Sequence, residues 1–201
     1  MKIKAIILDI GDVVLLENDQ EVFPKLVDKF GIHEENFLEI RRRYVDKALV
    51  LKRNTFWYEK KIARGLKVNV KNFINYWQEL REKYFDFNQE AKNIINSLKK
   101  QGYFLISLTN VIYSHELIRK KKGVYDSFDL NFKSREMGIK KPSEKIFKKI
   151  LKKIDFVPEQ ILFIDDKESN IELAKKLGIN VLQFTDYNQL KKDLKRFEVE
   201  V

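Results

Sequence analysis

Residues 3–9 read IKAIILD, and this stretch decides the fold class. The apolar run is too short for a helix, so it predicts a strand buried on both faces. Similar runs recur at 103–108 and 161–164, with shorter ones at 128–132 and 181–184, and helical patterns separate them. Strands that alternate with helices form right-handed crossover units. We therefore expect an α/β protein with a parallel sheet that is covered by helices on both faces.

The segment between the first two strands has a different character. From about residue 20 to residue 85 no strand pattern stands out, and apolar residues recur at the spacing of amphipathic helices. The first of these helices should end at Gly31. We expect an all-helical insertion at 18–86, with residues 1–17 and 87–201 forming the α/β core.

Length and composition exclude several classes of protein. The chain has 201 residues, which suits one large domain or one domain with an insertion. It has no cysteine, so disulfide frameworks, thiolate metal sites and a cysteine nucleophile are excluded. It has no apolar run long enough to span a membrane, and the first apolar run reaches Asp9 too soon for a signal peptide. We expect a soluble, cytoplasmic protein.

The charge balance is basic, with 40 Lys and Arg against 30 Asp and Glu, a net charge of +10. Such an excess can indicate nucleic-acid binding. Most lysines, however, alternate with apolar residues at helical spacing, as between 145 and 153, which is typical of a solvated helix face. The basic run 119–122 falls at a predicted helix end, where cations oppose the helix dipole. We expect no nucleic-acid or membrane partner, and an attraction for small anionic molecules.

Polar residues that can do chemistry follow the predicted strands. Asp9 comes after the first strand, Thr109 and Asn110 after the second, and the pair Asp165-Asp166 after the fourth. Ligands of parallel sheets bind at the carboxyl ends of the strands, so we expect these groups to converge.

Three carboxylates in one cleft repel one another unless a cation joins them. Mg²⁺ binds carboxylates together with phosphate oxygens. The set therefore suits Mg²⁺-assisted phosphoryl chemistry, with Asp9 as nucleophile, Lys141 of the 138–142 turn as a cation, and Thr109 and Asn110 as donors to phosphate oxygens.

Four segments together carry a family resemblance. They are residues 8–14 (LDIGDVV), 107–110 (SLTN), 138–142 (GIKKP) and 163–170 (FIDDKESN). In this order they resemble the four motifs of the haloacid dehalogenase-like hydrolase superfamily. The helical block resembles the cap that one branch inserts between the first two motifs. The resemblance implies a Rossmann-like three-layer core and, in most members, phosphoryl transfer through an aspartyl-phosphate.

The resemblance also implies roles for individual residues. Asp9 matches the nucleophile and a Mg²⁺ ligand, and Thr109 matches the hydroxyl of the second motif. Lys141 matches the lysine of the third motif, whereas Lys140 is expected to be a surface neighbour. Asp166 matches the main metal-binding acid, and Asp165 a ligand or a partner of one.

The first motif departs from the family pattern at Gly11. The usual residue there is a second aspartate that acts as general acid and base. The Gly11 carbonyl can still coordinate Mg²⁺, but no side chain remains to protonate a leaving group. Asp12 is either a substitute acid or, as we expect, a turn residue in the left-handed conformation. A branch similar to α-glucose-1-phosphatases has a similar motif, so the missing acid does not imply an inactive enzyme.

Three hypotheses of function follow. The first is a Mg²⁺-dependent phosphatase of small metabolites, which favours good leaving groups such as sugar 1-phosphates because acid catalysis is missing. The second is a non-catalytic binding protein on the same fold. The third is a haloacid dehalogenase, although that branch resembles metal-free enzymes without the acidic pair. Candidate side chains for reading the substrate's anionic group are Arg41, Arg42, Arg43 and Arg53.

Overall fold

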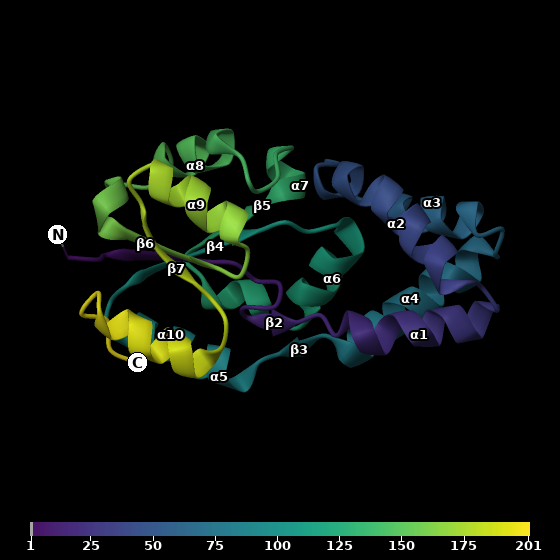
Figure 1. The fold of residues 1–201 in the computed structure, drawn as a ribbon, viewed down its shortest axis with the longest axis horizontal. Helices are drawn as coiled ribbons and strands as arrows, with labels where there is room; N and C mark the ends of the chain where they lie inside the picture. The colour runs from purple at the N-terminus through teal and green to yellow at the C-terminus, as the bar shows by residue number, and fades with distance from the viewer. Residues whose placement is uncertain (1) are drawn as a thin grey trace.

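The computed structural model describes residues 2–201 and has a parallel five-stranded sheet at its centre (Figure 1). The strands are β1 (Ala5–Leu8), β4 (Phe104–Thr109), β5 (Leu130–Lys133), β6 (Ile161–Asp165) and β7 (Asn180–Gln183). Their order is β5-β4-β1-β6-β7, and every pairing within this sheet is parallel. The predicted α/β, Rossmann-like fold is confirmed.

Helices cover both faces of the sheet. On one face lie α8 (Glu144–Leu151) and α9 (Glu168–Lys176), and on the other α5 (Gln89–Lys100) and α10 (Tyr187–Lys195) (Figure 1). Alternate residues of β1 serve the two faces, because successive side chains of a strand point in opposite directions. Ile6 and Leu8 pack with α5 and α10, whereas Ala5 and Ile7 pack with α8. This is why β1 is apolar throughout.

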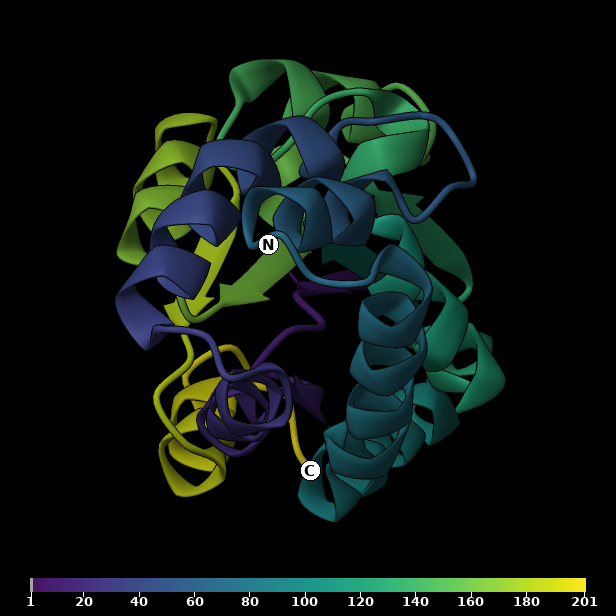
Figure 2. The same ribbon diagram turned by 90° about the vertical axis from the view of Figure 1, so that its right-hand side faces the viewer.

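The segment between β1 and α5 carries four helices with a core of their own. They are α1 (Asp19–Phe30), α2 (Glu34–Leu49), α3 (Trp57–Gly65) and α4 (Val70–Tyr84). Figure 2 shows these purple-to-blue helices in front of the sheet. Phe37, Phe73 and Trp77 are fully buried among them. As predicted, α1 ends at Gly31, whose left-handed φ of 59° favours glycine.

The helical segment leaves and rejoins the rest of the chain at one place. Two short strands, β2 (Leu15–Leu16) and β3 (Asp86–Phe87), pair there antiparallel. The Asn18 side chain also donates a hydrogen bond to the Tyr84 carbonyl at 2.7 Å. The expected boundaries, after residues 17 and 86, fall at this junction. The division into a core and a cap stays a prediction.

The remaining elements are short or lie beside the sheet edge. They are α6 (Tyr113–Lys121), α7 (Ser134–Met137) and the 3₁₀ turns η1 (Val124–Ser127) and η2 (Pro158–Gln160). Pro142 lies just before α8, which begins at Glu144. Among residues 2–201, no helix combines the length and apolar character needed to cross a membrane.

Candidate active site

The sheet order brings the predicted site residues together. Strand β1 lies between β4 and β6, so the residues that follow these three strands share one edge. This edge carries Asp9, Thr109, Asp165 and Asp166, as the carboxyl ends of parallel strands predict. All except Asp166 are buried.

A buried lysine joins two of the carboxylates. The Lys141 Nζ lies 2.9 Å from Asp9 Oδ1 and 2.6 Å from Asp165 Oδ2, and Lys141 is only 3% exposed. Asp9 Oδ1 also accepts a hydrogen bond from the Ile10 backbone N–H at 2.7 Å. These contacts with Lys141 and Ile10 hold Oδ1 of the Asp9 carboxylate and thereby orient its second oxygen, Oδ2.

The Asn110 side chain fixes the backbone of Lys141. Its Nδ2 donates to the Lys141 carbonyl, and its Oδ1 accepts from the Lys141 N–H, both at 2.8 Å. This pairing was not foreseen, because Asn110 was expected to bind substrate. That role stays a prediction, while the observed contacts place Lys141 between the carboxylates.

Asp9, Asp165 and Asp166 form a set that can hold a divalent cation. One oxygen from each lies within 4.8 Å of the others. Asp165 is already engaged, since its Oδ1 accepts from Asn170 Nδ2 at 2.8 Å and from the Lys167 N–H at 2.9 Å. Asp166 Oδ1, in contrast, is buried and accepts no hydrogen bond from residues 2–201. An orphaned carboxylate oxygen in an all-oxygen donor set fits Mg²⁺.

Within the set of Asp9, Asp165 and Asp166, burial and mutual repulsion disfavour the ionised forms of Asp9 and Asp166. Burial raises the pKa of Asp9, against the opposing effect of Lys141. Burial also raises the pKa of Asp166, and the negative charge of Asp9 adds to this increase. A bound cation reverses the effect, because it favours the ionised carboxylates.

A small cavity opens onto these groups. Its volume is about 70 Å³. Its lining residues are Asp9, Gly11, Asp12, Glu17, Asn110, Arg119, Lys141, Lys167 and Asn170. Gly11 thus lies at the cavity, while its expected part in metal binding stays a prediction. Asp12 has a left-handed φ of 57°, in accord with the turn interpretation, and its Oδ1 accepts from the Glu17 N–H at 3.5 Å.

Sequence reasoning missed Arg119, Glu17 and His115. Arg119 was assigned with the basic run 119–122 to a helix end, where cations oppose the helix dipole. It is in fact 1% exposed, and its Nη1 donates to Thr109 Oγ1 at 2.7 Å. Its Nη2 pairs with Glu17 Oε1. His115 Nδ1 lies 3.5 Å from the same oxygen. The one available signal was position: both Arg119 and His115 belong to the helix that follows Thr109.

The ion pair between Arg119 and Glu17 determines the charge states in the cluster of Glu17, Arg119 and His115. Although burial alone would raise it, Arg119 and His115 hold the pKa of Glu17 well below its usual range. Burial lowers the pKa of His115 to about 4, and Glu17 opposes this only in part. At neutral pH the cluster therefore holds an ionised Glu17, a charged Arg119 and a neutral His115.

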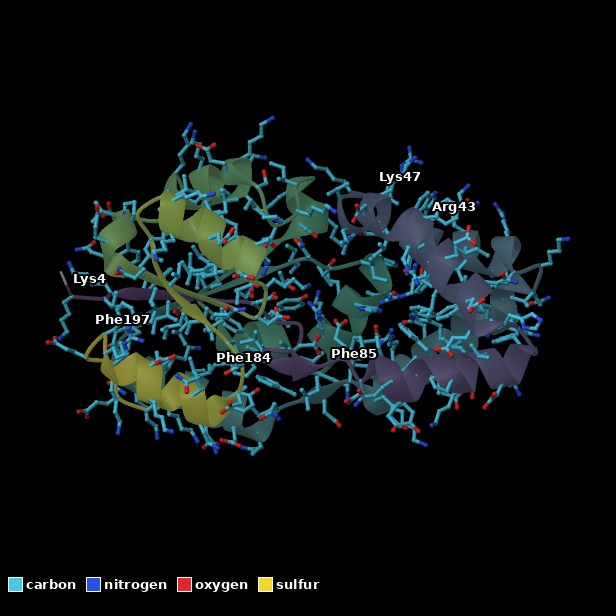
Figure 3. The ribbon with its side chains drawn as sticks, in the orientation of Figure 1. Lys4, Arg43, Lys47, Phe85, Phe184 and Phe197 are labelled. Carbon is cyan, nitrogen blue, oxygen red and sulfur yellow. The ribbon has the colours of Figure 1, made fainter. Side chains whose placement is uncertain are left out.

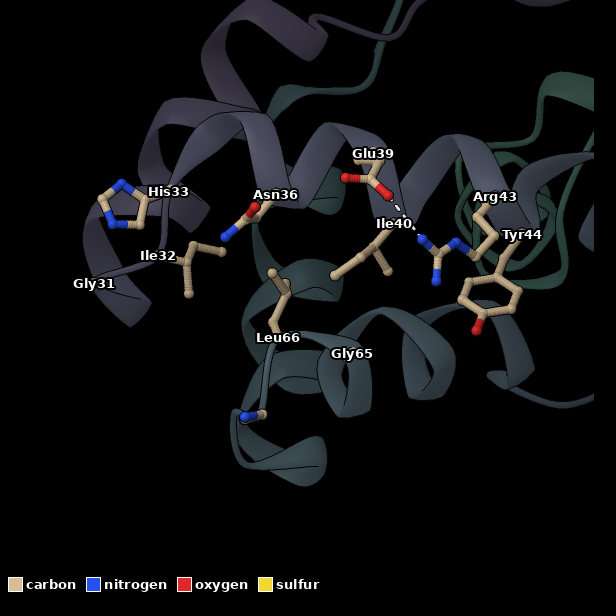
Figure 4. Close-up of a pocket in the computed structure, with 11 residues that line it drawn as sticks. Gly31, Ile32, His33, Asn36, Glu39, Ile40, Arg43, Tyr44, Gly65 and Leu66 are labelled. Carbon is tan, nitrogen blue, oxygen red and sulfur yellow. Dashed lines mark hydrogen bonds and ion pairs between the residues drawn. The ribbon is translucent and has the colours of Figure 1, made fainter.

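Two of the arginines suggested as readers of an anionic group, Arg41 and Arg43, pair with carboxylates. Arg41 Nη2 pairs with Asp19 at 3.0 Å, and Arg43 pairs with Glu39 at 2.7 Å. In Figure 3, Arg43 lies on the helical part of the molecule, and Phe85 lies between it and the sheet. Arg43 also lines a cavity of about 520 Å³ (Figure 4). The cavity is lined by α2, the end of α3 and the turns that follow α1 and α3, and no residue of the sheet contributes to it. The two cavities have no lining residue in common.

The two lysines of the third motif differ as expected. Lys141 is enclosed by carboxylates, whereas the partly exposed Lys140 reaches Asp46 of α2. Lys140 is thus a surface residue that also contacts the helical segment.

Comparisons with known proteins agree with the fold. The chain is 32% identical over 96 residues to the sesquiterpene phosphatase astK of Aspergillus oryzae, a match covering 47% of this chain and 48% of that one. It is 32% identical over 95 residues to a D-ribitol-5-phosphate phosphatase of Bacteroides thetaiotaomicron, covering 45% and 46%. The chain thus spans about half the length of these curated relatives.

A solved structure shows the same fold over nearly the whole chain. The enzyme bt-2542 of Bacteroides thetaiotaomicron, in complex with magnesium and inorganic phosphate, superposes with a TM-score of 0.75 at 22% identity and covers 94% of this chain and 98% of its own. The model of the haloacid dehalogenase-like hydrolase family matches residues 3–178, which include all four motifs. The chain therefore belongs to the haloacid dehalogenase-like hydrolase family.

Proposed function

We propose that the chain is a Mg²⁺-dependent phosphatase of small phosphate esters, which acts through a phosphorylated Asp9. One observation carries the proposal: Lys141 bridges Asp9 and Asp165, while Asp166 Oδ1 has no hydrogen-bond partner within residues 2–201. Asp9 is thus a nucleophile fixed beside the Lys141 ammonium group. Next to it, the Asp166 oxygen is available to bind a second cation, the metal ion.

The residues divide the work of phosphoryl transfer. Asp9 Oδ2 attacks phosphorus and the bond to the ester oxygen breaks, which gives an acyl phosphate that water then hydrolyses. Lys141 holds Asp9 and offsets the charge of the phosphate oxygens. Thr109 Oγ1 accepts from Arg119, so its own hydrogen is free to donate to phosphate.

Asp9, Asp166 and the Gly11 carbonyl are the groups that would hold Mg²⁺, with Asp165 orienting Lys141. When bound, the ion supplies positive charge at the phosphate oxygens. Formally, three carboxylates and a phosphate dianion carry five negative charges. Lys141 and Lys167 offset only part of them, and Arg119 is already paired with Glu17, so a further cation is needed.

The relatives support a small phosphorylated substrate. Those named above include phosphatases of a sesquiterpene and of D-ribitol 5-phosphate, and a third, from Pyrococcus furiosus, is a glyceraldehyde 3-phosphate phosphatase. Gly11 leaves the first motif without its acid, so we propose that esters with good leaving groups, such as sugar 1-phosphates, react fastest.

The alternatives fit the site less well. A metal-free dehalogenase has no use for the orphaned Asp166 oxygen. A pure binding protein would not need Asp9 fixed at one oxygen with the other left for attack.

A panel of phosphate esters, assayed with Mg²⁺ and with EDTA, tests the proposal. Wild type should hydrolyse p-nitrophenyl phosphate only with Mg²⁺, and Asp9→Asn should abolish this turnover. Turnover that survives Asp9→Asn would refute the role of Asp9. Absence of turnover across the panel would favour the binding protein.

A further inference from the structure

Two charged side chains lie close to Gly11, the position at which the first motif lacks its acid. A Cβ built on Gly11 would lie 3.4 Å from Arg119 Nη2 and 3.8 Å from Glu17 Oε1. Both distances are ordinary van der Waals contacts, so a Cβ would fit here. Any side chain at this position would have a guanidinium and a carboxylate as its nearest neighbours.

The Arg119 guanidinium is fixed in this place from several sides. Its Nη1 donates to Thr109 Oγ1 at 2.7 Å, and its Nη2 pairs with Glu17 Oε1. A guanidinium has five N–H donors, so these two bonds leave others for a ligand. Arg119 Nε is buried without a hydrogen-bond partner among residues 2–201, although Arg119 lines the same cavity as Asp9 and Lys141.

Glu17 is itself held firmly at the junction with the helical segment. Its carbonyl accepts a hydrogen bond from the buried Arg81 Nη1 at 2.9 Å. Its carboxylate receives Arg119 and lies 3.5 Å from His115 Nδ1. The largely buried ion pair of Arg119 and Glu17 costs desolvation energy when it forms. Stabilisation of the fold alone is therefore a weak explanation for its presence.

We propose that Arg119 is a catalytic residue that stabilises the leaving oxygen, and that Glu17 positions it. The inference rests on the proposed phosphatase function. As Asp9 Oδ2 bonds to phosphorus, the bond between phosphorus and the ester oxygen breaks and its electron pair stays on that oxygen. Arg119 donates a hydrogen bond to the developing anion, which later takes its proton from water.

This arrangement differs from acid catalysis in a measurable way. A guanidinium keeps its proton at any ordinary pH, so it offsets charge without transferring a proton. Poor leaving groups develop the most charge on oxygen and should depend most on Arg119. Good leaving groups, such as p-nitrophenolate, should depend on it little.

The test compares kcat/KM for p-nitrophenyl phosphate and glycerol phosphate, with Mg²⁺. Arg119→Lys keeps a positive charge but lacks the fork that reaches both Thr109 and Glu17. We expect it to lose on the order of 10²-fold on glycerol phosphate, as for removal of one preorganised donor, and less than about tenfold on p-nitrophenyl phosphate. Glu17→Gln leaves every donor of Arg119 in place, so it should lose less activity than Arg119→Lys. The loss should again be greater on glycerol phosphate than on p-nitrophenyl phosphate, and it should appear in kcat rather than in KM.

Arg135→Lys is the matched control. Arg135 is also buried and paired with a carboxylate, Glu116, but it does not line the cavity at Asp9. Its change should alter the rates on both esters by the same factor. If Arg119→Lys does not fold, Glu17→Gln carries the same comparison.

The outcomes separate the two proposals. Suppose that the wild type is active and that Arg119→Lys loses the same factor of kcat/KM on both esters, or loses none. Either result would overturn the role of Arg119 alone. A wild type that hydrolyses neither ester with Mg²⁺ would overturn the phosphatase function and the inference with it.

Discussion

Replacing Lys141 by methionine should separate stability from catalysis at this site. Methionine keeps the length of the side chain but removes the charge that lies between Asp9 and Asp165, at 2.9 and 2.6 Å. Two buried carboxylates then face each other without a positive charge between them, although each keeps its other hydrogen bonds. Breaking a buried ion pair in this way costs about 3–5 kcal/mol. In a chain of this size that corresponds to a fall in Tm of roughly 6–20 °C.

Thermal unfolding in EDTA and in Mg²⁺ measures this effect. Because Mg²⁺ adds positive charge next to the same carboxylates, it should restore part of the lost Tm in Lys141→Met. Activity should stay low, by on the order of 10²-fold or more in kcat/KM, since the ion cannot replace the fixed ammonium group. Adding Asp165→Asn should recover stability without recovering activity.

Lys140→Met is the control, because it removes a neighbouring charge whose partner, Asp46, lies at the surface. Exposed ion pairs contribute about 0–1 kcal/mol, so its Tm and activity should change little. Equal effects of Lys140→Met and Lys141→Met, or an unchanged Tm of Lys141→Met in EDTA, would refute this reasoning.

Three further predictions concern other residues. Asp166→Asn should lose most activity by weakening metal binding, and raised Mg²⁺ should recover part of it; a loss that no Mg²⁺ concentration alters would give Asp166 another role. Asn110→Ala removes both 2.8 Å hydrogen bonds to the Lys141 backbone. The resulting misplacement of Lys141 should lower kcat roughly ten- to hundredfold. An unchanged kcat would show that Asn110 does not position Lys141. Burial lowers the pKa of His115 to about 4, so the unfolded chain takes up a proton at higher pH than the folded one, and stability falls as the pH drops from about 6.5 toward 4. This histidine should account for about 2 kcal/mol of the stability lost between about pH 8 and about pH 5, and His115→Gln should show a smaller fall in Tm over that range; an identical fall would contradict the neutral state.

The parts of the molecule that could be predicted are those with local signals. The strands that carry the site are short apolar runs, and the chemistry follows each strand directly, so Asp9, Thr109 and Asp165 could be assigned to one sheet edge. The four helices of the inserted segment could be placed because their apolar residues keep helical spacing. The pairing of β2 with β3 could not, because strands of two residues have no pattern.

The interactions around the nucleophile were harder to predict because they join distant segments. Glu17 and Arg119 are 102 residues apart in the chain, and the basic run around Arg119 is typical of a solvated surface. Only the fold shows that Arg119 points inward while its neighbours in the run do not. The same holds for Asn110, whose side chain contacts a turn 31 residues away.

The central claim is that Asp9 carries the phosphoryl group during turnover. Enzyme mixed with Mg²⁺ and a phosphate ester, quenched in acid within one turnover and digested, gives the measurement by mass spectrometry. The account predicts one added phosphoryl group on the peptide that contains Asp9, and none in Asp9→Asn or in EDTA. An active wild type without this adduct under the same quench, or with the adduct on another residue, would contradict the account.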